Sequence, residues 1–580
     1  MTHGRTRRLA SLVQRILDTI ERSNVTSTGK HSVSHQQTLR KNSVYIQHTP
    51  MRAFLLWCAV SLCVVTSAGA ATLDGFVTKI DSPAEFDLGA THIAINSQTR
   101  CWTQKSSPFR IIWGRWGQPR VRFSVRNEGK KLAVPCTGLA YGFGSRVHLR
   151  GEVEPHGRFA ATSMTVYAIR PRRTIDGGAL IEEPPHLQTV DRRLIGVAWI
   201  DGYPLRIIPA TKLSSAPSDT VFLSNLNTPS FGFPLAIRPK IKSHRAQALV
   251  PVVLVRPNSW AAYHATHARE AHITANSILV WPNDMVSKEE RYIQQFIPVI
   301  VPPDYSRNLP GTITYGKAKP ITIIPNHKVQ EWVSGLGTEL VPRFWKTPQR
   351  GGNDKINFRF YVVQSFPARL GSYFVETTGF MPRYEVLLWN RQSAFYYFKP
   401  PMGITACEVV ASPDGTVLVP DGVLQGLQNQ AQLSALLSYA ITSVIQAQGF
   451  HGLPTYFVPN PMERASAIGD IRNSALVGVW QNEQALRIGI RQMYLAGYDI
   501  REAPFAGVLA QGKKMNNPVI DSKHPDQEFP GYAAYAFNYI SQYYKDVDFS
   551  KLKRGRREYQ QFLQELYKAD PSLSRPEAND

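Results

Sequence analysis

The sequence predicts a multidomain protein in which two small all-β domains precede a larger, helix-rich α+β domain. Three observations support this prediction. The chain has 580 residues, more than a single hydrophobic core usually organises. Residues 73–170 contain short alternating segments separated by turn residues, which is typical of all-β domains. Beyond residue 325 the apolar residues recur at helical spacing instead.

The N-terminal residues predict an export signal. Residues 1–50 are polar and basic without a periodic apolar run, and we expect them to be a disordered or non-native leader. Residues 51–70, MRAFLLWCAVSLCVVTSAGA, have a basic start, an apolar run and a small-residue end. This pattern predicts a signal peptide that is cleaved near Ala70. The mature protein is therefore expected to be periplasmic or extracellular.

The composition is that of a folded protein with a basic surface. Hydrophobic residues make up 43% of the chain, charged residues 19%, and the formal net charge is +23. A basic exported protein suits peripheral contact with an anionic membrane or cell wall. Export also argues against a nucleic-acid partner.

Export changes what the cysteines predict. In an oxidising compartment Cys101 and Cys136 are expected to form a disulfide within the first β domain. Cys407 is then left over, and we expect it to be a buried thiol. Three cysteines this scattered do not form a zinc-binding pattern.

The first β domain is expected to span residues 72–170. Its predicted strands are GFVTKID (75–81), THIAI (91–95), RVRFSV (120–125), RVHLRGEV (146–153) and FAATSMTVYAI (159–169). Residues 145–167 align without gaps on residues 259–281, so a second, related domain is predicted at 175–283. Both resemble the small OB-like barrel, of unknown function, that recurs in exported bacterial proteins.

Each of two patterns within these domains can be interpreted either as a binding site or as ordinary structure. Trp113 and Trp116 alternate with basic residues in WGRWGQPR (113–120), which could stack on bases, but an exposed loop with packing tryptophans is favoured. A second pattern has metal-ligating residue types, namely His264, His267, Glu270 and His272. On a β hairpin, residues three apart point to opposite faces, which disfavours a shared ion.

The C-terminal part changes character after a Pro/Gly-rich segment, and residues 284–324 are predicted to be a linker before a domain at 325–580. Helices are predicted at 329–341, within 482–504, where Gly497 stops the helix, at about 530–546 and at 555–568. A strand is predicted at 356–365, and a strand turning into a helix at 415–424. Between them, LQNQAQLSALLSYAITSVIQAQG (427–449) has apolar residues at i, i+3, i+4, i+7, i+8 and i+11. It is therefore predicted to be a buried amphipathic helix.

This order of elements resembles a family of zinc metallopeptidases, the one that includes the CAAX prenyl proteases and the HtpX-type proteases, in a soluble exported form. The resemblance covers about 325–530 and rests on FRFYVV, GTVLVPDGVL, the helix QLSALLSYAITSVIQAQ, ALRIGIRQMYLAGYD and a late His524–Pro525. Compared with the family, the segment 366–404 looks like an insertion.

The resemblance implies a zinc site whose ligands this chain lacks. In the family, H-E-x-x-H on the first helix and a Glu on the second hold zinc, and an Asp four residues later supports the site. The corresponding positions here are Tyr439, Ala440, Ser443, Asn482 and Leu486. None offers an imidazole, thiolate or carboxylate, so no metal or other cofactor is expected. Glu483 and His451 could replace a ligand, but a solvated Glu and a loop His are favoured.

The sequence therefore favours a non-catalytic peptide- or protein-binding relative of the peptidases, with peptides or exported proteins as partners. A general base contributes roughly 10²–10⁴-fold to a rate, and Ala440 has no proton acceptor. Two alternatives stay open: an active zinc metalloendopeptidase with substituted ligands, and a cell-wall- or carbohydrate-binding protein that acts through the β domains. GVLAQGKK (507–514) is not a P-loop, because Lys514 replaces the magnesium-binding Ser or Thr.

Overall fold

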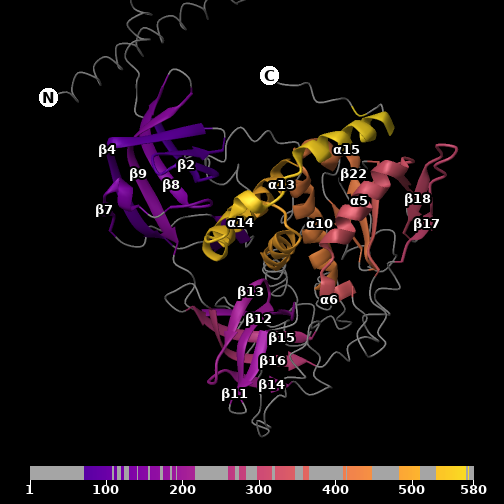
Figure 1. Cartoon of the computed structure of the whole chain (residues 1–580), viewed down its shortest axis with the longest axis horizontal. Helices are drawn as coiled ribbons and strands as arrows, with labels where there is room; N and C mark the ends of the chain where they lie inside the picture. The colour runs from indigo at the N-terminus through magenta and orange to yellow at the C-terminus, as the bar shows by residue number, and fades with distance from the viewer. Residues whose placement is uncertain are drawn as a thin grey trace, which may run out of the picture. The chain divides into compact units, whose positions relative to one another are not determined.

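The protein has several domains, with sheets through much of the chain and most helices towards the C-terminus (Figure 1). The computed structural model describes residues 71–215, 259–281, 297–346, 357–364, 409–446, 483–509 and 531–569, apart from short gaps within these ranges. The predicted leader and signal peptide, the insertion at 366–404, Cys407 and His524–Pro525 lie outside the described residues. Within the described part of the chain, no helix is long and apolar enough to cross a membrane.

The first sheet has the strand order β1-β8-β9-β4-β3-β2, with β7 paired to β4. Its strands are β1 (Ala71–Phe76), β2 (Lys79–Ser82), β3 (Glu85–Leu88), β4 (Thr91–Ser106), β7 (Leu132–Val134), β8 (Arg146–Val153) and β9 (Phe159–Ile169). Strands β8 and β9 have the bounds that the sequence predicts. The single strand predicted at 75–81 is wrong, because the chain leaves β1 and starts β2 within it. Strands β5 (Arg110–Trp113) and β6 (Pro119–Arg122) form a separate hairpin.

The second sheet repeats the six-strand order of the first, while its seventh strand pairs differently. Its order is β10-β15-β16-β13-β12-β11, with β14 paired to β16. Its strands are β10 (Thr174–Leu180), β11 (His186–Val190), β12 (Arg193–Ile200), β13 (Tyr203–Ile207), β14 (Lys212–Ser215), β15 (Trp260–His267) and β16 (Ile273–Trp281).

The repeat extends to a local irregularity of the backbone. The register shifts between Arg150 and Gly151 in the first sheet, and between His264 and Ala265 in the second. These two pairs of residues are matched in the ungapped alignment of 145–167 with 259–281. A β-bulge at the same point of both sheets supports a common origin for the two segments, because bulges are specific features of a fold.

Both sheets curl. The chain that follows β1 pairs with β3 in the first sheet, and the chain that follows β10 pairs with β12 in the second. In the first sheet, the Thr78 amide donates to the Asp87 carbonyl at 2.9 Å. In the second, Ile181 pairs with Ile200, and the Glu182 amide donates to the Trp199 carbonyl at 3.0 Å. The two sheets are therefore partly curled.

Cys101 and Cys136, the pair that the sequence predicts, are joined by a disulfide with a Cα–Cα distance of 5.2 Å. Cys101 is buried in the core of the first sheet beside Met164 and Leu149. The bond links β4 to the short helical turn at Cys136–Gly138 and closes a loop with a sequence separation of 35 residues.

Replacing Cys136 by serine is expected to lower the free energy of unfolding of the first sheet by about 2–4 kcal/mol, because the unfolded chain loses a covalent constraint. Chemical unfolding of the oxidised protein and the variant measures the difference. Adding reductant to the wild-type protein should reproduce the loss and leave the variant unchanged. Equal stability of all three samples would contradict the prediction.

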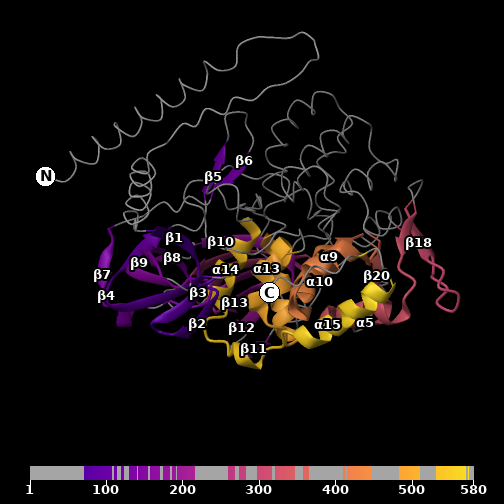
Figure 2. The same ribbon diagram turned by 90° about the horizontal axis from the view of Figure 1, so that it is seen from above.

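The third sheet has the order β17-β18-β19-β20-β22-β21. Its strands are β17 (Val299–Val301), β18 (Gly311–Thr314), β19 (Ile321–Ile323), β20 (Arg359–Val363), β21 (Val410–Ala411) and β22 (Thr416–Pro420). Strands β20 and β22 are parallel, and the other neighbours are antiparallel. The linker predicted at 284–324 is therefore wrong in its second half, because β17, β18 and β19 are part of this sheet. Figure 2 shows β18 at the end of the sheet away from α10.

The helices of the C-terminal part follow the predicted order closely. They are α5 (His327–Leu340), α6 (Arg343–Lys346), α9 (Asp421–Gly426), α10 (Gln430–Ile445), a helix at 483–495, α13 (Ala503–Leu509), α14 (Gly531–Tyr543) and α15 (Arg556–Ala569). Asn326 and Asn429 begin α5 and α10, and each side chain accepts a hydrogen bond from the backbone three residues on.

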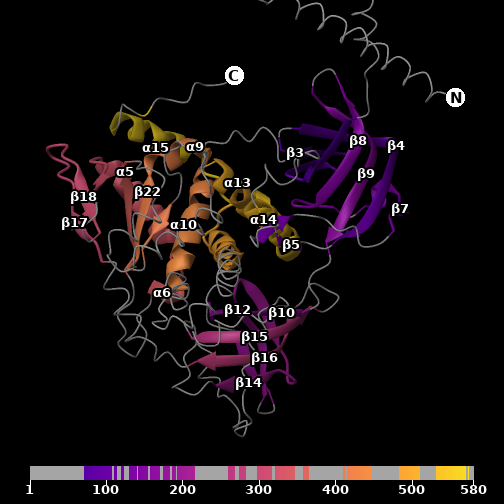
Figure 3. The ribbon, with the colours of Figure 1, turned by 180° about the vertical axis from the view of Figure 1, so that it is seen from behind.

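Helices α5 and α10 lie side by side near β22 (Figures 1 and 3). Their apolar residues share a large core with Phe360, Val362, Val417 and Val419 of the third sheet and with the interior of the second sheet. The alternate residues of the third sheet form a smaller core on the other face, which includes Ile313, Ile323 and Leu418. The two faces of this sheet therefore belong to different cores, and the helices cover one of them.

Candidate functional site

The helices that carry the family positions, α10 and the helix at 483–495, pack in direct contact. Gly489 makes this possible, since a Cβ atom there would lie 3.2 Å from the Tyr439 backbone nitrogen and 3.3 Å from the Ser438 carbonyl carbon. A larger residue would push the two helices apart. The structure thereby brings the Tyr439 turn of α10 next to Gly489 of the second helix.

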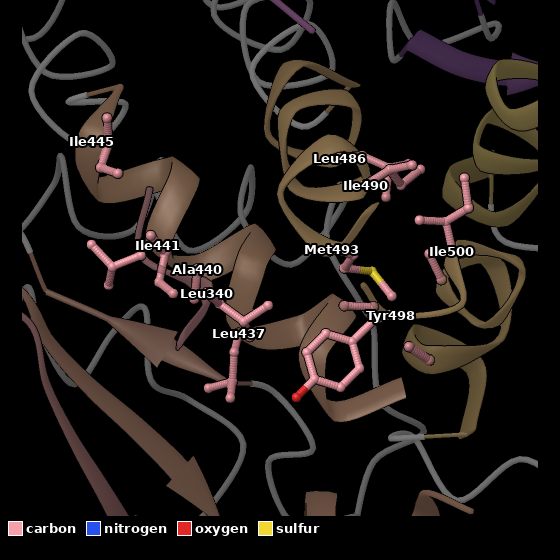
Figure 4. Packing of buried hydrophobic residues seen from close by; sticks show 14 of the residues in the cluster. Leu340, Leu437, Ala440, Ile441, Ile445, Leu486, Ile490, Met493, Tyr498 and Ile500 are labelled. Carbon is pink, nitrogen blue, oxygen red and sulfur yellow. The ribbon is translucent and has the colours of Figure 1, made fainter. Parts of the chain in front are cut away.

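The two apolar family positions lie within the core (Figure 4). Ala440 has an exposed fraction of 3% and Leu486 of 4%, and both belong to the same hydrophobic cluster as Leu437, Ile441 and Ile490. In the resemblance these positions correspond to the general base and to the Asp that supports the third ligand. Both are occupied here by carbon side chains that pack against apolar neighbours.

The two described polar family positions, Tyr439 and Ser443, offer only hydroxyl groups. Tyr439 and Ser443 are half-buried, and the Ser443 hydroxyl donates to the Tyr439 carbonyl at 3.0 Å within α10. Glu483, whose side chain is 25% exposed, is 4.0 Å from Arg487, one helical turn away. Asn482 and His451 lie outside the described residues. At the four family positions that are described, the residue types do not fit a zinc ion.

The AGYD motif, at residues 496–499, has a structural explanation. Gly497 ends the helix with a φ of +81°, a conformation that favours glycine. The buried Tyr498 hydroxyl donates to Glu339 at 2.8 Å. Asp499, also buried, pairs with Arg501 at 2.7 Å and with Arg554 at 2.9 Å. The motif joins the helix at 483–495 to α5 and to the segment before α15.

The opposite face of the helix at 483–495 carries a buried ionic network that the sequence analysis missed. Arg487 pairs with Asp201 in the turn between β12 and β13, and its Nε also donates to the Asp201 carbonyl at 2.9 Å. The exposed fractions of these two side chains are 3% and 1%. Tyr263 adds a hydrogen bond to the Asp201 carboxylate at 2.9 Å.

The turn itself fits closely against this helix. Asp201 and Gly202 have φ angles of 61° and 74°. A Cβ atom on Gly202 would lie 2.7 Å from the Arg487 side chain, so glycine is needed for the contact. Tyr539 of α14 donates to the Gly202 carbonyl. The β12–β13 turn is therefore held by two helices at once.

A second buried pair lies one helical turn further along. Arg491 Nε is 3.3 Å from Glu182 Oε2, and its guanidinium carbon is 3.2 Å from the ring centroid of Trp199. Burial raises the pKa of the Glu182 carboxyl from 4.5 to about 7, although Arg491 and the Gly202 amide both favour its ionised form. Glu182 thus changes charge near neutral pH inside an interface.

Replacing Glu182 by glutamine is expected to change how stability depends on pH. Because the folded-state pKa lies above the ordinary value of 4.5, the contribution of Glu182 is fully present below about pH 4.5 and is lost as the pH rises through about 7. Chemical unfolding between pH 4.5 and 7 should show wild-type stability falling relative to that of the variant. Parallel curves would contradict the prediction.

A sequence signal for this network did exist. Arg487 and Arg491 are spaced four residues apart within a helix whose other face is apolar. Two cations on a buried helix need anionic partners. The partners could not be named, because Asp201 and Glu182 lie hundreds of residues away in a different predicted domain.

The histidine pattern of the second sheet is not assembled as a metal site in the described residues. His267 Nε2 lies 2.7 Å from the Tyr543 hydroxyl of α14, and His264 is half-buried on β15. Glu270 and His272 lie outside the described residues, as does most of the WGRWGQPR loop. The structure instead places Asp81, Asp87 and His92 together in the first sheet. The Asp87 carboxylate already pairs with His92 at 2.8 Å, and the Asp81 carboxylate pairs with Lys79 at 2.6 Å.

No model of a known protein family matches this chain, and no curated protein matches it either.

Proposed function

We propose that this protein is an exported, non-catalytic relative of the zinc metallopeptidases that binds extended polypeptide. The observation that carries the proposal is the burial of Ala440 and Leu486 in one apolar core. A peptidase needs a general base and an activated water at this place. Apolar packing supports the helix pair without a metal, and it leaves the described positions without the groups that hydrolysis requires.

Binding of polypeptide is proposed from the sheet next to α10. Peptides commonly add to the exposed edge of a sheet, where main-chain hydrogen bonds provide affinity. Strand β21 is an edge strand of the third sheet, and α10 contacts it. The resemblance implies that family members bind substrate along such an edge.

Export and the OB-like assignment of the first two sheets belong to the same proposal. The disulfide between Cys101 and Cys136 supports an oxidising compartment. The shared strand order and the curling of both sheets support two small barrels. Peptides or other exported proteins are the partners proposed.

The test uses the purified mature chain, fluorescein-labelled casein as an unfolded polypeptide, and metal analysis. We expect saturable binding of the labelled polypeptide that a chelator does not change, no cleavage of it, and less than stoichiometric zinc. Stoichiometric zinc together with chelator-sensitive cleavage would overturn the proposal in favour of an active metalloendopeptidase.

A further inference from the structure

Exposed apolar side chains gather on one hairpin of the third sheet. Among the described residues, ten large apolar side chains are exposed, and five of these lie on β17 and on the segments that flank it. Their exposed fractions run from 41% to 68%. They form what we call the hairpin patch: Ile297, Val299, Val301, Tyr305 and Leu309. A concentration of this kind is typical of a contact surface, whereas single exposed apolar residues are ordinary.

The strands of the patch lie beyond the helices that cover the rest of the sheet. Ile300 packs against the smaller core of the third sheet, so its neighbours Val299 and Val301 point to the opposite face. There they lie opposite Thr314 and Thr312 of β18. The helices cover this face at β20 and β22, but Figures 1 and 2 show β18 at the end of the sheet, beyond α5. The apolar side chains of β17 therefore face solvent.

Prolines make β17 a poor edge for the addition of another strand. Pro298 precedes this three-residue strand, and Pro302 and Pro303 follow it. Proline has no N–H to donate, and prolines on an edge strand hinder pairing with another chain. The patch therefore offers apolar side chains without a long row of main-chain groups. This disfavours a polypeptide strand, or β17 of a second copy, as the occupant.

The charge of the chain favours an anionic surface instead. The formal net charge is +23, and residues 297–323 carry Arg307, Lys317 and Lys319 against one acid, Asp304. Arg307 is 78% exposed, and its 3.8 Å pair with Asp304 is too exposed to hold it strongly. Tyr305 adds an apolar ring with a polar tip, a side chain that is common where a membrane meets water.

We propose that the hairpin patch attaches the protein peripherally to an anionic lipid surface. Its apolar side chains would enter the boundary between headgroups and acyl chains, while the cations of the chain meet the headgroups. Attachment of this kind needs no membrane-spanning helix. Strands β17 and β21 are the opposite ends of the third sheet, so the edge proposed for polypeptide stays accessible. Neither proposal depends on the other.

The experiment measures cosedimentation of the full mature chain with vesicles of phosphatidylcholine and phosphatidylglycerol. We expect binding that is at least roughly tenfold weaker on vesicles of phosphatidylcholine alone, since the cations lose their partners. Val299→Ser/Val301→Ser should weaken binding to the mixed vesicles roughly tenfold, because apolar groups no longer enter the boundary. The matched control Leu132→Ser/Val153→Ser changes residues of the first sheet that are 56% and 64% exposed, and it should bind as wild type.

Hydrogen exchange of wild type gives a second readout that needs no variant. Mixed vesicles should slow exchange within residues 297–309 and leave β11, an edge strand of the second sheet, unchanged. Slower exchange at β11 instead, no binding by wild type, or equal binding by Val299→Ser/Val301→Ser and wild type would each overturn the proposal. Self-association that this variant loses, without any binding to vesicles, would overturn it in favour of a second copy as the occupant.

Discussion

Replacing Arg487 by methionine is expected to lower the free energy of unfolding by about 3–5 kcal/mol, because it leaves a buried carboxylate without its cation. Asp201 has an exposed fraction of only 1%, so water cannot replace the guanidinium. The Tyr263 hydroxyl would remain its hydrogen-bond donor. Chemical unfolding in urea measures the loss.

The double variant Arg487→Met/Asp201→Asn separates the buried charge from the lost packing. Asparagine tolerates the positive φ of 61° at this position, so the turn is preserved. We expect the double variant to be more stable than Arg487→Met alone. Arg158→Met is the matched control, since its pair with Glu85 is exposed and should contribute less than about 1 kcal/mol. Similar losses in Arg158→Met and Arg487→Met would refute the argument.

Restoring the family residues is expected to create zinc-dependent stability. The variant Tyr439→His, Ala440→Glu, Ser443→His, Asn482→Glu places a carboxylate where the exposed fraction is 3%. Without metal, such a charge should cost several kcal/mol, on the order of other uncompensated buried charges. Zinc at about a thousand times its Kd should return about 4 kcal/mol by binding only the folded state. Thermal unfolding with and without zinc measures both effects.

The single variant Ala440→Glu is the control for this prediction. It should show the destabilisation but no recovery with zinc, because it lacks the imidazole ligands. The unmodified protein should show neither effect. If zinc leaves the fourfold variant as unstable as before, the four positions do not converge, and the resemblance to the metallopeptidases is wrong.

Local patterns were sufficient to predict most helices of the C-terminal part. The apolar spacing around Leu433 and Leu437 predicted α10, and Gly497 marked the end of the next helix. These features succeed because helix periodicity and a positive-φ glycine act over a few residues. Alternation likewise predicted the bounds of β8 and β9, and the shared bulge lies within the ungapped repeat.

Three strands that lie among prolines and glycines were predicted to be part of a linker, and the reason is physical. Strands β17, β18 and β19 are short and lie among prolines and glycines, so the composition indicated a linker. A three-residue strand has too few residues to show alternation, and it is stable only because neighbouring strands pair with it. The split of 75–81 into β1 and β2 likewise depends on pairing with different partners.

The sequence by itself determined that Tyr439, Ala440, Ser443, Asn482 and Leu486 offer no imidazole, thiolate or carboxylate, because ligand chemistry depends only on residue type. It also determined the cysteine pair and the repeated β segments. Tertiary structure alone decided that Arg487 and Arg491 meet Asp201 and Glu182, and that Gln446 and Gln484 hydrogen-bond to the backbone of β10. These contacts join residues hundreds of positions apart. No local pattern encodes such partners, since a buried charge or amide shows only that it needs one.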